Sequence, residues 1–196
     1  HALSAQKLGV DAVTMIGYGS GGHIGNDNVA SFILLPKAVA ALDIPVIAGG
    51  AICNGRGFLG ALAMGAEAVL MGTAFMMTEE CKVHPNIKER LLETKETDTA
   101  LLLTTLMNPV RCIKNKLADE CLAIEAEGAD FEKIINTVAG GKGQVAYDNG
   151  DPDGAPISCG QIAGCIDEIK SVRQVIDDIL AEADLLLARL NGLVAN

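Results

Sequence analysis

The chain has 196 residues and a formal net charge of -10, with 49% hydrophobic and 20% charged residues. This composition provides enough apolar side chains for a packed core and too little charge for a disordered segment. The negative charge disfavours duplex nucleic acid as a partner, and no apolar run reaches the roughly 18 residues that a membrane span needs. We therefore expect one domain, alone or with a small accessory lobe, that acts on a small molecule.

The six cysteines form no C-x-x-C pair, and no Cys/His cluster has the spacing of a zinc site. We interpret them as reduced thiols in a cytoplasmic protein and expect no metal. They are Cys53, Cys81, Cys112, Cys121, Cys159 and Cys165.

The first elements are typical of a chain that alternates strands and helices. Residues 1–8 resemble the end of a helix that stops at Gly9, and an apolar strand is expected over 10–16. A domain rarely starts inside a helix, so we expect the chain to be part of something longer. Residues 17–28 hold five glycines in nine positions, which predicts a loop, and a helix containing Pro36 follows over 31–42.

The central stretch has the pattern strand, glycine turn, helix, strand, glycine turn. Residues 44–48 and 66–71 are short apolar runs, each followed directly by glycine, and Asn54 is placed to cap the helix between them. Wholly apolar strands joined by helices are typical of a parallel sheet buried on both faces. The glycine clusters then lie at the carboxyl ends of the strands, where α/β proteins bind ligands.

The pattern changes after Pro85. We expect helices over 86–93, 115–127 and Phe131–Val138, an extended segment over 97–110, and a loop-rich segment over 142–160. Residues 171–190 give the clearest helix, with an apolar stripe that we attribute to packing and a stop at Gly192. These features divide the chain into a β/α part over 1–85, a lobe over 86–165 and a C-terminal helical part over 166–196.

Two glycine turns and one histidine carry the chemistry. Gly50 and Gly72 follow neighbouring strands, where free backbone N–H groups suit a phosphate, although each could be an ordinary tight turn. His23 lies in the glycine loop, where an imidazole can act as a general base or make only a structural hydrogen bond. We expect His84 to be structural.

Three stretches, G-Y-G-S-G-G-H-I-G, I-P-V-I-A-G-G-A-I-C-N-G-R-G and A-L-A-M-G-A-E-A-V-L-M-G-T-A-F-M, resemble the nitronate monooxygenase family of FMN enzymes. Flavin-dependent enoyl-acyl-carrier-protein reductases are similar to them. The resemblance implies the sixth to eighth strands of a TIM (β/α)8 barrel, followed by a mostly helical lobe that binds substrate. It also implies that His23 is the catalytic base and that Gln161 lies near the active site. The residues implied to hold or border FMN are Gly21, Gly22, Gly50, Ala51, Gly72 and Thr73.

The chain departs from that family pattern at several positions. The family often has glutamate where Gly19 or Ser20 stands, usually has glycine in place of Ala51, and frequently has aspartate in place of Asn54. Five strands of such a barrel are not in this sequence, so a second chain or a missing N-terminal half would have to complete it.

Three hypotheses follow. The chain is part of an FMN enzyme that oxidises alkyl nitronates or nitroalkanes with O2, or part of an enoyl-thioester reductase with a nicotinamide donor. Alternatively it is a non-catalytic chain that docks on a partner. The third hypothesis predicts an exposed apolar strand edge at residues 10–16 and no ligand at Gly50 or Gly72.

Overall fold

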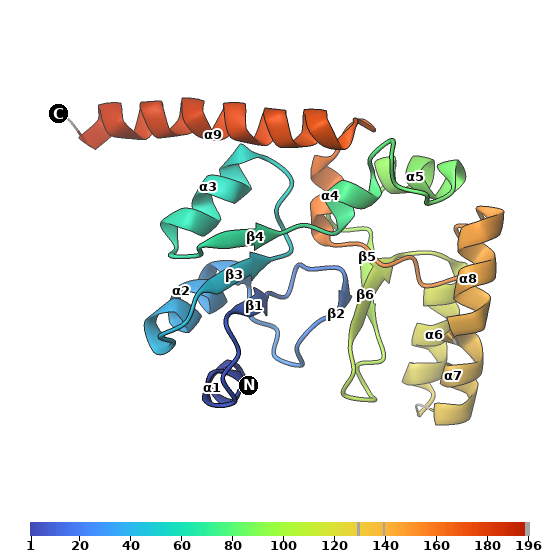
Figure 1. Cartoon of the computed structure of the whole chain (residues 1–196). Helices are drawn as coiled ribbons and strands as arrows, with labels where there is room; N and C mark the ends of the chain where they lie inside the picture. Colours follow the sequence, from blue (N-terminus) through green and yellow to red (C-terminus); the bar gives the residue numbers. More distant parts are fainter. Residues whose placement is uncertain (129, 139, 195–196) are drawn as a thin grey trace.

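The computed structural model describes residues 1–128, 130–138 and 140–194. Two three-stranded sheets with helices packed around them make up this part of the chain (Figure 1). The elements in order are α1 (Ala2–Lys7), β1 (Val13–Ile16), β2 (Gly22–His23), α2 (Ser31–Ala41), β3 (Val46–Gly49), α3 (Gly55–Ala63), β4 (Ala68–Leu70), α4 (Thr73–Met76), α5 (Pro85–Leu92), β5 (Thr99–Leu102), β6 (Val110–Ile113), α6 (Lys116–Ala126), α7 (Phe131–Val138), α8 (Gly140–Asn149), the 3-10 helix η1 (Gln161–Cys165) and α9 (Val172–Val194).

The first sheet is parallel, as the strand–helix alternation predicts. Its strand order is β1-β3-β4, and β1 pairs with β3 in the register Val13↔Val46. Apolar side chains from the strands and from α2 and α3 form one core, which includes Leu35, Ala48 and Ala61. The predicted cap is confirmed, because the Asn54 side chain accepts a hydrogen bond of 2.9 Å from the Gly57 N–H.

Both outer strands of this sheet have an open edge. Within the described residues, β1 and β4 each pair only with β3. The prediction of strands buried on both faces holds for most of β3 and is wrong for β4, where Leu70 is 50% exposed. Ile16 at the end of β1 is 39% exposed. Some apolar side chains of these strands are therefore not buried by the rest of the described chain.

The second sheet is antiparallel, in the order β2-β6-β5. Its strand β2 comes from the glycine loop, so the prediction of a continuous loop over 17–28 is wrong at Gly22 and His23. Gly22 has a φ of 73° and pairs with Arg111, and His23 pairs with Val110. These partners lie far along the chain, and no local pattern marks the pairing. The expected extended segment over 97–110 is confirmed at its two ends, in β5 and β6.

The helices of the C-terminal half follow the predictions except at α8 and at the end of α9. Gly128 has a φ of 121° beyond the end of α6, and the Asp130 side chain accepts from the Lys133 N–H at 3.1 Å in the first turn of α7. The predicted loop over 142–160 is wrong over 142–149, because α8 extends to Asn149, and is confirmed over 150–160. Ala146, which is 4% exposed, and Tyr147 join a core with Met77 and Ile157, and this burial outweighs the weak helix propensity of the glycines.

The long helix α9 crosses over α3 and continues beyond it (Figure 1). Ile179 and Ala183 are buried, and α9 lies so close to α3 that a Cβ on Gly55 would be 2.5 Å from the Ala183 nitrogen. The apolar stripe predicted for this helix therefore packs only in part, because Leu187 and Leu190 are 48% and 45% exposed. The predicted stop at Gly192 is wrong, because the helix continues to Val194.

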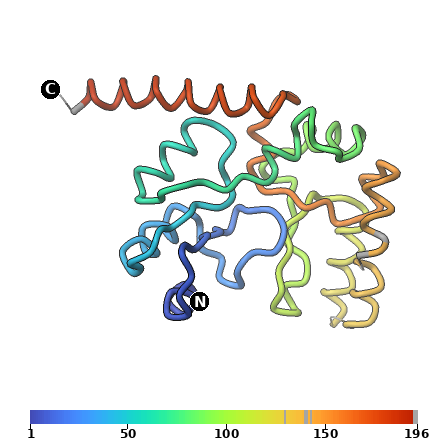
Figure 2. The backbone as a smooth tube through the Cα atoms, viewed as in Figure 1, coloured from blue at the N-terminus to red at the C-terminus, as the bar shows by residue number. Residues whose placement is uncertain are grey.

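The backbone trace places the two ends of the described chain far apart. In Figure 2 the N-terminus lies on the side of the parallel sheet opposite α9, and the C-terminus lies at the far tip of α9. Among the described residues, no helix combines the length and apolar composition that crossing a bilayer requires.

Candidate functional site

A pocket of about 300 Å³ lies at the carboxyl ends of β3 and β4. It brings together the six residues that the family resemblance assigns to FMN, and no charged side chain lines it among the described residues. The chain has a net charge of -10, and carboxylates in the pocket would repel an anionic ligand. A lining without carboxylates is therefore compatible with such a ligand. The lining residues are Ile16, Ser20, Gly21, Gly22, Gly50, Ala51, Ile52, Leu70, Gly72, Thr73, Met76, Ser158, Gly160 and Ile162.

The turn after β3 has an unusual backbone. Gly50 and Ala51 have φ values of 76° and 59°, in the left-handed region. The Gly50 N–H donates to the Leu70 carbonyl at 3.2 Å, and a Cβ on Gly50 would collide with the Ser20 side chain. Gly50 therefore ties β3 to β4 and makes room for the glycine loop, so its own N–H is already used. The Ala51 N–H has no hydrogen-bond acceptor among the described residues.

The turn after β4 contributes a buried hydroxyl. Thr73 is 9% exposed, and its Oγ1 accepts a hydrogen bond of 3.0 Å from the Gly160 N–H. That bond uses a lone pair, so the hydroxyl proton stays able to donate to a ligand. Gly72 and Thr73 stand at the start of α4, where N–H groups have no partner within the helix.

The glycine loop forms the third wall and packs through backbone atoms. Ser20 is 3% exposed and donates to the Gly49 carbonyl at 3.3 Å. A Cβ on Gly21 would collide with the backbone of Cys159, so the loop and residues 159–160 approach without side chains between them. Glycine at position 21 is required by this contact.

Gln161 holds the same loop from the outside. Its N–H donates to the Gly19 carbonyl at 2.9 Å. Its side chain lines a neighbouring cavity of about 420 Å³ with Tyr18 and Ser31, while the pocket of the six predicted residues is lined without it. Gln161, which the family resemblance places near the active site, thus contacts the glycine loop but does not line that pocket.

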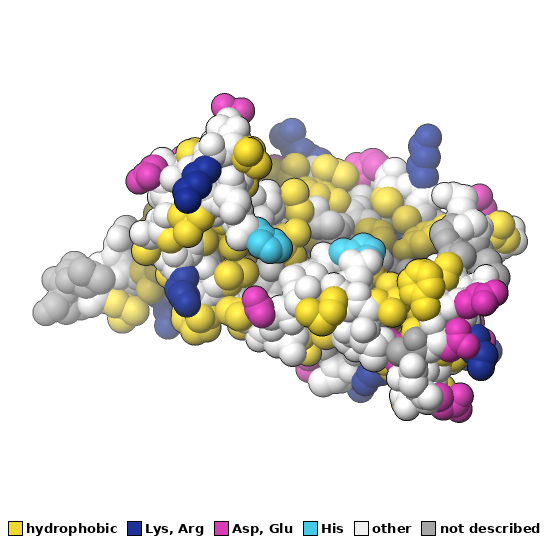
Figure 3. Space-filling view, turned by 90° about the horizontal axis from the view of Figure 1, so that it is seen from below, with side chains coloured by type: hydrophobic (Ala, Val, Ile, Leu, Met, Phe, Trp, Pro, Cys, Tyr) yellow, Lys and Arg dark blue, Asp and Glu magenta, His cyan; other side chains and the backbone are white. Residues whose placement is uncertain are grey.

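His23 stands at the rim. It follows Gly22, which lines the pocket, but its own side chain is exposed and is not part of the lining. The Ile24 N–H donates to the Pro109 carbonyl at 3.1 Å, which holds the His23 backbone against the second sheet. Figure 3 shows a face with hydrophobic side chains in its hollows and histidine side chains near its middle. His84 is structural, as predicted, because its Nδ1 accepts from the Asn86 N–H at 3.2 Å and caps α5.

Arg111 is a functional candidate that reasoning from sequence missed. It is 3% exposed, and its Nε and Nη2 donate to the Tyr18 carbonyl at 3.1 and 2.8 Å. Its Nη1 donates to Thr99 Oγ1 at 2.8 Å, and its Cζ lies 4.6 Å from the centroid of the Tyr18 ring. The only signal in the sequence was its place in a stretch with thin resemblance to the flavin family.

The cysteines are free thiols, as expected. Burial raises the pKa of Cys112 and of Cys159 to about 12, so both are neutral near pH 7. No cluster of three metal-ligating side chains occurs in the part of the chain that the structure describes. The candidate site therefore offers backbone N–H groups, one threonine hydroxyl and one histidine at the rim.

Comparison with known proteins now gives the family. The model of the family described as nitronate monooxygenase matches residues 1–182. The chain belongs to the nitronate monooxygenase family. A "Probable nitronate monooxygenase" of Bacillus subtilis (strain 168) is 31% identical over 189 residues, which are 93% of this chain and 54% of that protein. The chain thus spans about half the length of the curated relatives it matches.

Solved structures of this family's relatives share the fold. FabK from Thermotoga maritima has a TM-score of 0.90 and 38% identity, and the match covers 98% of this chain and 60% of FabK. The nitroalkane oxidase of Streptomyces ansochromogenes has a TM-score of 0.79 and 26% identity, covering 96% of this chain and 56% of the oxidase.

Proposed function

We propose that the pocket between the two glycine turns holds the phosphate end of FMN. The proposal rests on one observation: all six predicted cofactor residues line a single pocket without charged side chains. Because the Gly50 N–H is used by Leu70, we assign phosphate binding to the N–H groups of Ala51, Gly72 and Thr73 and to the Thr73 hydroxyl. Gly21 and Gly22 leave the loop without side chains where the ring system would lie.

We assign to His23 the removal of a proton from the carbon that bears the nitro group of a nitroalkane substrate, which leaves the substrate as its nitronate. Its exposed imidazole beside the pocket is open to a small substrate, and a general base contributes a rate factor of about 10² to 10⁴. Bound FMN would supply the oxidising chemistry and pass the electrons to O2. The lobe over 86–165 brings Ser158, Gly160 and Ile162 to the pocket, and we propose that it binds substrate.

The test is FMN titration followed by turnover of a neutral nitroalkane, whose oxidation requires the proton transfer assigned to His23. We expect wild-type protein to quench FMN fluorescence, and His23→Gln to keep FMN binding while losing at least about 100-fold in kcat. His84→Gln is the matched control, since the amide oxygen can still cap α5 and should leave kcat unchanged. Failure of the natural wild-type polypeptide, with the strands that complete its barrel, to bind FMN would overturn the proposal.

A second candidate is an enoyl-thioester reductase that takes electrons from a nicotinamide. The observation that favours it is the similarity to the enoyl reductase FabK, whose TM-score of 0.90 exceeds the 0.79 of the nitroalkane oxidase. Anaerobic addition of NADH or NADPH separates the two candidates. Rapid bleaching of the flavin bands supports the reductase, whereas bleaching by a nitronate alone supports the oxidase.

We also propose that β1, β3 and β4 are the sixth to eighth strands of a (β/α)8 barrel whose other strands lie outside this sequence. The open edges of β1 and β4 and the exposed Ile16 and Leu70 support this. A groove of about 790 Å³ runs beside β1 between α1 and α2, where further β/α units would pack. If those strands belong to a separate chain, this chain is a docking subunit, and the mass of the natural polypeptide decides between the two arrangements.

A further inference from the structure

The glycine loop is held mainly by the C-terminal half of the chain. Gly22 and His23 pair with Arg111 and Val110 of β6, and the Gln161 N–H donates to the Gly19 carbonyl. On the side of the first sheet, the Ser20 hydroxyl donates to the Gly49 carbonyl. The position of the loop over the pocket is thus set across a boundary between two parts of the fold.

Arg111 is the centre of that attachment. Two of its nitrogens converge on the Tyr18 carbonyl, and the Tyr18 ring stacks on the same guanidinium. Tyr18 therefore meets Arg111 through both its backbone and its side chain. The third nitrogen is fixed by Thr99 on β5, so the guanidinium plane has one orientation.

The electrostatic setting of Arg111 is unusual for a structural residue. It is 3% exposed, and no carboxylate lies within ion-pair distance of it among the described residues. Burying an unpaired cation is expensive, and a well-packed apolar side chain would generally be as stable. Only an arginine offers a planar fork for one carbonyl together with a face for an aromatic ring.

We propose that Arg111 is a positioning residue for the flavin site: its fork fixes the Tyr18 carbonyl and thereby places residues 19–23, including His23, over the pocket. This inference rests on the proposed function for its catalytic consequence, but its structural consequence can be measured without any ligand. Through Arg111, the lobe over 86–165 determines where His23 stands.

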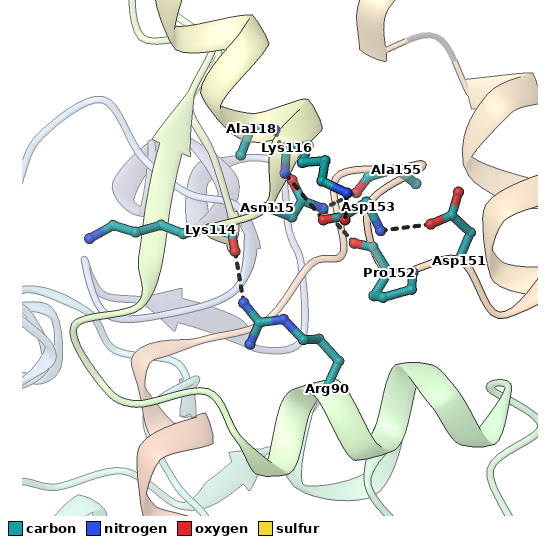
Figure 4. Close-up of polar contacts among 9 residues, drawn as sticks. All are labelled: Arg90, Lys114, Asn115, Lys116, Ala118, Asp151, Pro152, Asp153 and Ala155. Carbon is teal, nitrogen blue, oxygen red and sulfur yellow. Dashed lines mark hydrogen bonds and ion pairs between the residues drawn. The ribbon is translucent and has the colours of Figure 1, made fainter.

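The test compares Arg111→Lys with Arg90→Lys. Arg90 is a matched control, because it also donates to one carbonyl, Lys114 O at 3.0 Å, and to one threonine hydroxyl, Thr94 Oγ1 at 3.3 Å. Arg90 lies on α5, away from the pocket, and Figure 4 shows its bond to Lys114. Amide hydrogen exchange of residues 17–24, measured without FMN, reports the order of the loop directly.

We expect Arg111→Lys to speed exchange in residues 17–24 by roughly tenfold or more, while Arg90→Lys leaves that segment unchanged. With FMN present, we expect Arg111→Lys to lower kcat by about 10- to 100-fold with a smaller change in KM, since the base is misplaced. Thr99→Val, which removes only the Nη1 acceptor, should give a smaller effect of the same kind. It also keeps the inference testable if Arg111→Lys does not fold.

Unchanged exchange in residues 17–24 of Arg111→Lys would overturn the inference whatever the activity. Faster exchange with unchanged FMN affinity and unchanged kcat would overturn it as well, because the loop would then be irrelevant to the site. Absence of FMN binding by the natural wild-type polypeptide would instead remove the proposed function, and the exchange measurement would still decide the role of Arg111 in the loop.

Discussion

Ala51 is the residue at which this chain differs most informatively from the family it resembles. Its φ of 59° is left-handed, which an alanine adopts at an energy of about 1–2 kcal/mol and a glycine adopts freely. The backbone of the turn has thus kept the shape that suits glycine. The strain lies at a residue that lines the pocket, where strained backbone is commonly tied to function.

Ala51→Gly should therefore bind FMN several-fold more tightly, since it removes a methyl group from the proposed phosphate turn. The free energy of unfolding should change little. The relief of about 1 kcal/mol of strain is offset by the roughly 0.5–1 kcal/mol of added chain entropy in the unfolded state. Fluorescence titration with FMN and urea unfolding measure the two quantities. Weaker FMN binding by Ala51→Gly would contradict the assignment of this turn.

The matched substitution one residue earlier should behave in the opposite way. Gly50→Ala places a Cβ against the Ser20 side chain in a left-handed backbone, so we expect a loss of about 3 kcal/mol in unfolding free energy. Urea unfolding measures it. A loss below about 1 kcal/mol would show that the loop can move away from this turn.

Arg111 is a residue whose role could not be predicted from the sequence. The glycines were found because each occurs in a short motif whose chemistry is local. Arg111 bonds to a carbonyl 93 residues away, and the carbonyl belongs to the backbone, so no side-chain pattern marks the partner.

Asparagine side chains cap two helices of the fold, and the two caps differ in how many hydrogen bonds they make. Asn54 makes one capping bond, to the Gly57 N–H at the start of α3. Asn115 caps α6 through the Ala118 N–H at 2.8 Å and also donates to the Pro152 and Ala155 carbonyls, both at 2.7 Å. Figure 4 shows this side chain between α6 and the segment that follows α8.

Asn115→Ala should destabilise the protein by about 3 kcal/mol, while Asn54→Ala should lose only about 1 kcal/mol. The difference arises because Asn115 is 6% exposed and its removal leaves two carbonyls without their donor. Thermal or urea unfolding of the two variants provides the comparison. Equal losses would mean that water donates hydrogen bonds to the Pro152 and Ala155 carbonyls in the variant.

The capping residues were visible in the sequence, whereas α8 was not. Caps depend on neighbours within three residues, so Asn54 could be assigned directly. Residues 140–149 contain three glycines and no apolar stripe, and their helix is stabilised by the contacts of Ala146 and Tyr147 with a core built from distant segments. Local propensity predicts a loop there, and tertiary burial reverses it.

For the molecule as a whole, the sequence predicted the parallel β/α part and the long final helix. It did not predict that the glycine loop would join a second sheet. That pairing joins β2 to β6, which lie in opposite halves of the chain, so it depends on the relative placement of whole units. The docking hypothesis alone anticipated an exposed strand edge, at residues 10–16, and the strand order shows open edges on both β1 and β4.

The C-terminal half should lose stability at alkaline pH, because Cys112 and Cys159 lie in its two hydrophobic cores. Burial raises the pKa of both thiols from 9.0 to about 12. Below pH 9 the folded and unfolded states both keep these protons, so the full stability is present. Between pH 9 and pH 12 the unfolded chain releases protons that the folded chain retains. The free energy of unfolding then falls by up to about 1.4 kcal/mol per pH unit for each thiol.

Urea unfolding at pH 8.5, 9.5 and 10.5 measures this decline, and the double variant Cys112→Ala/Cys159→Ala serves as its control. Other groups that titrate in this range, such as lysines and tyrosines, are shared by both proteins, so the difference in slope isolates the two thiols. We expect the wild type to lose about 2 kcal/mol more than the variant between pH 9.5 and pH 10.5. Parallel slopes would show that water reaches these sulfur atoms in the folded protein, since only exclusion of water keeps the thiols protonated in this pH range.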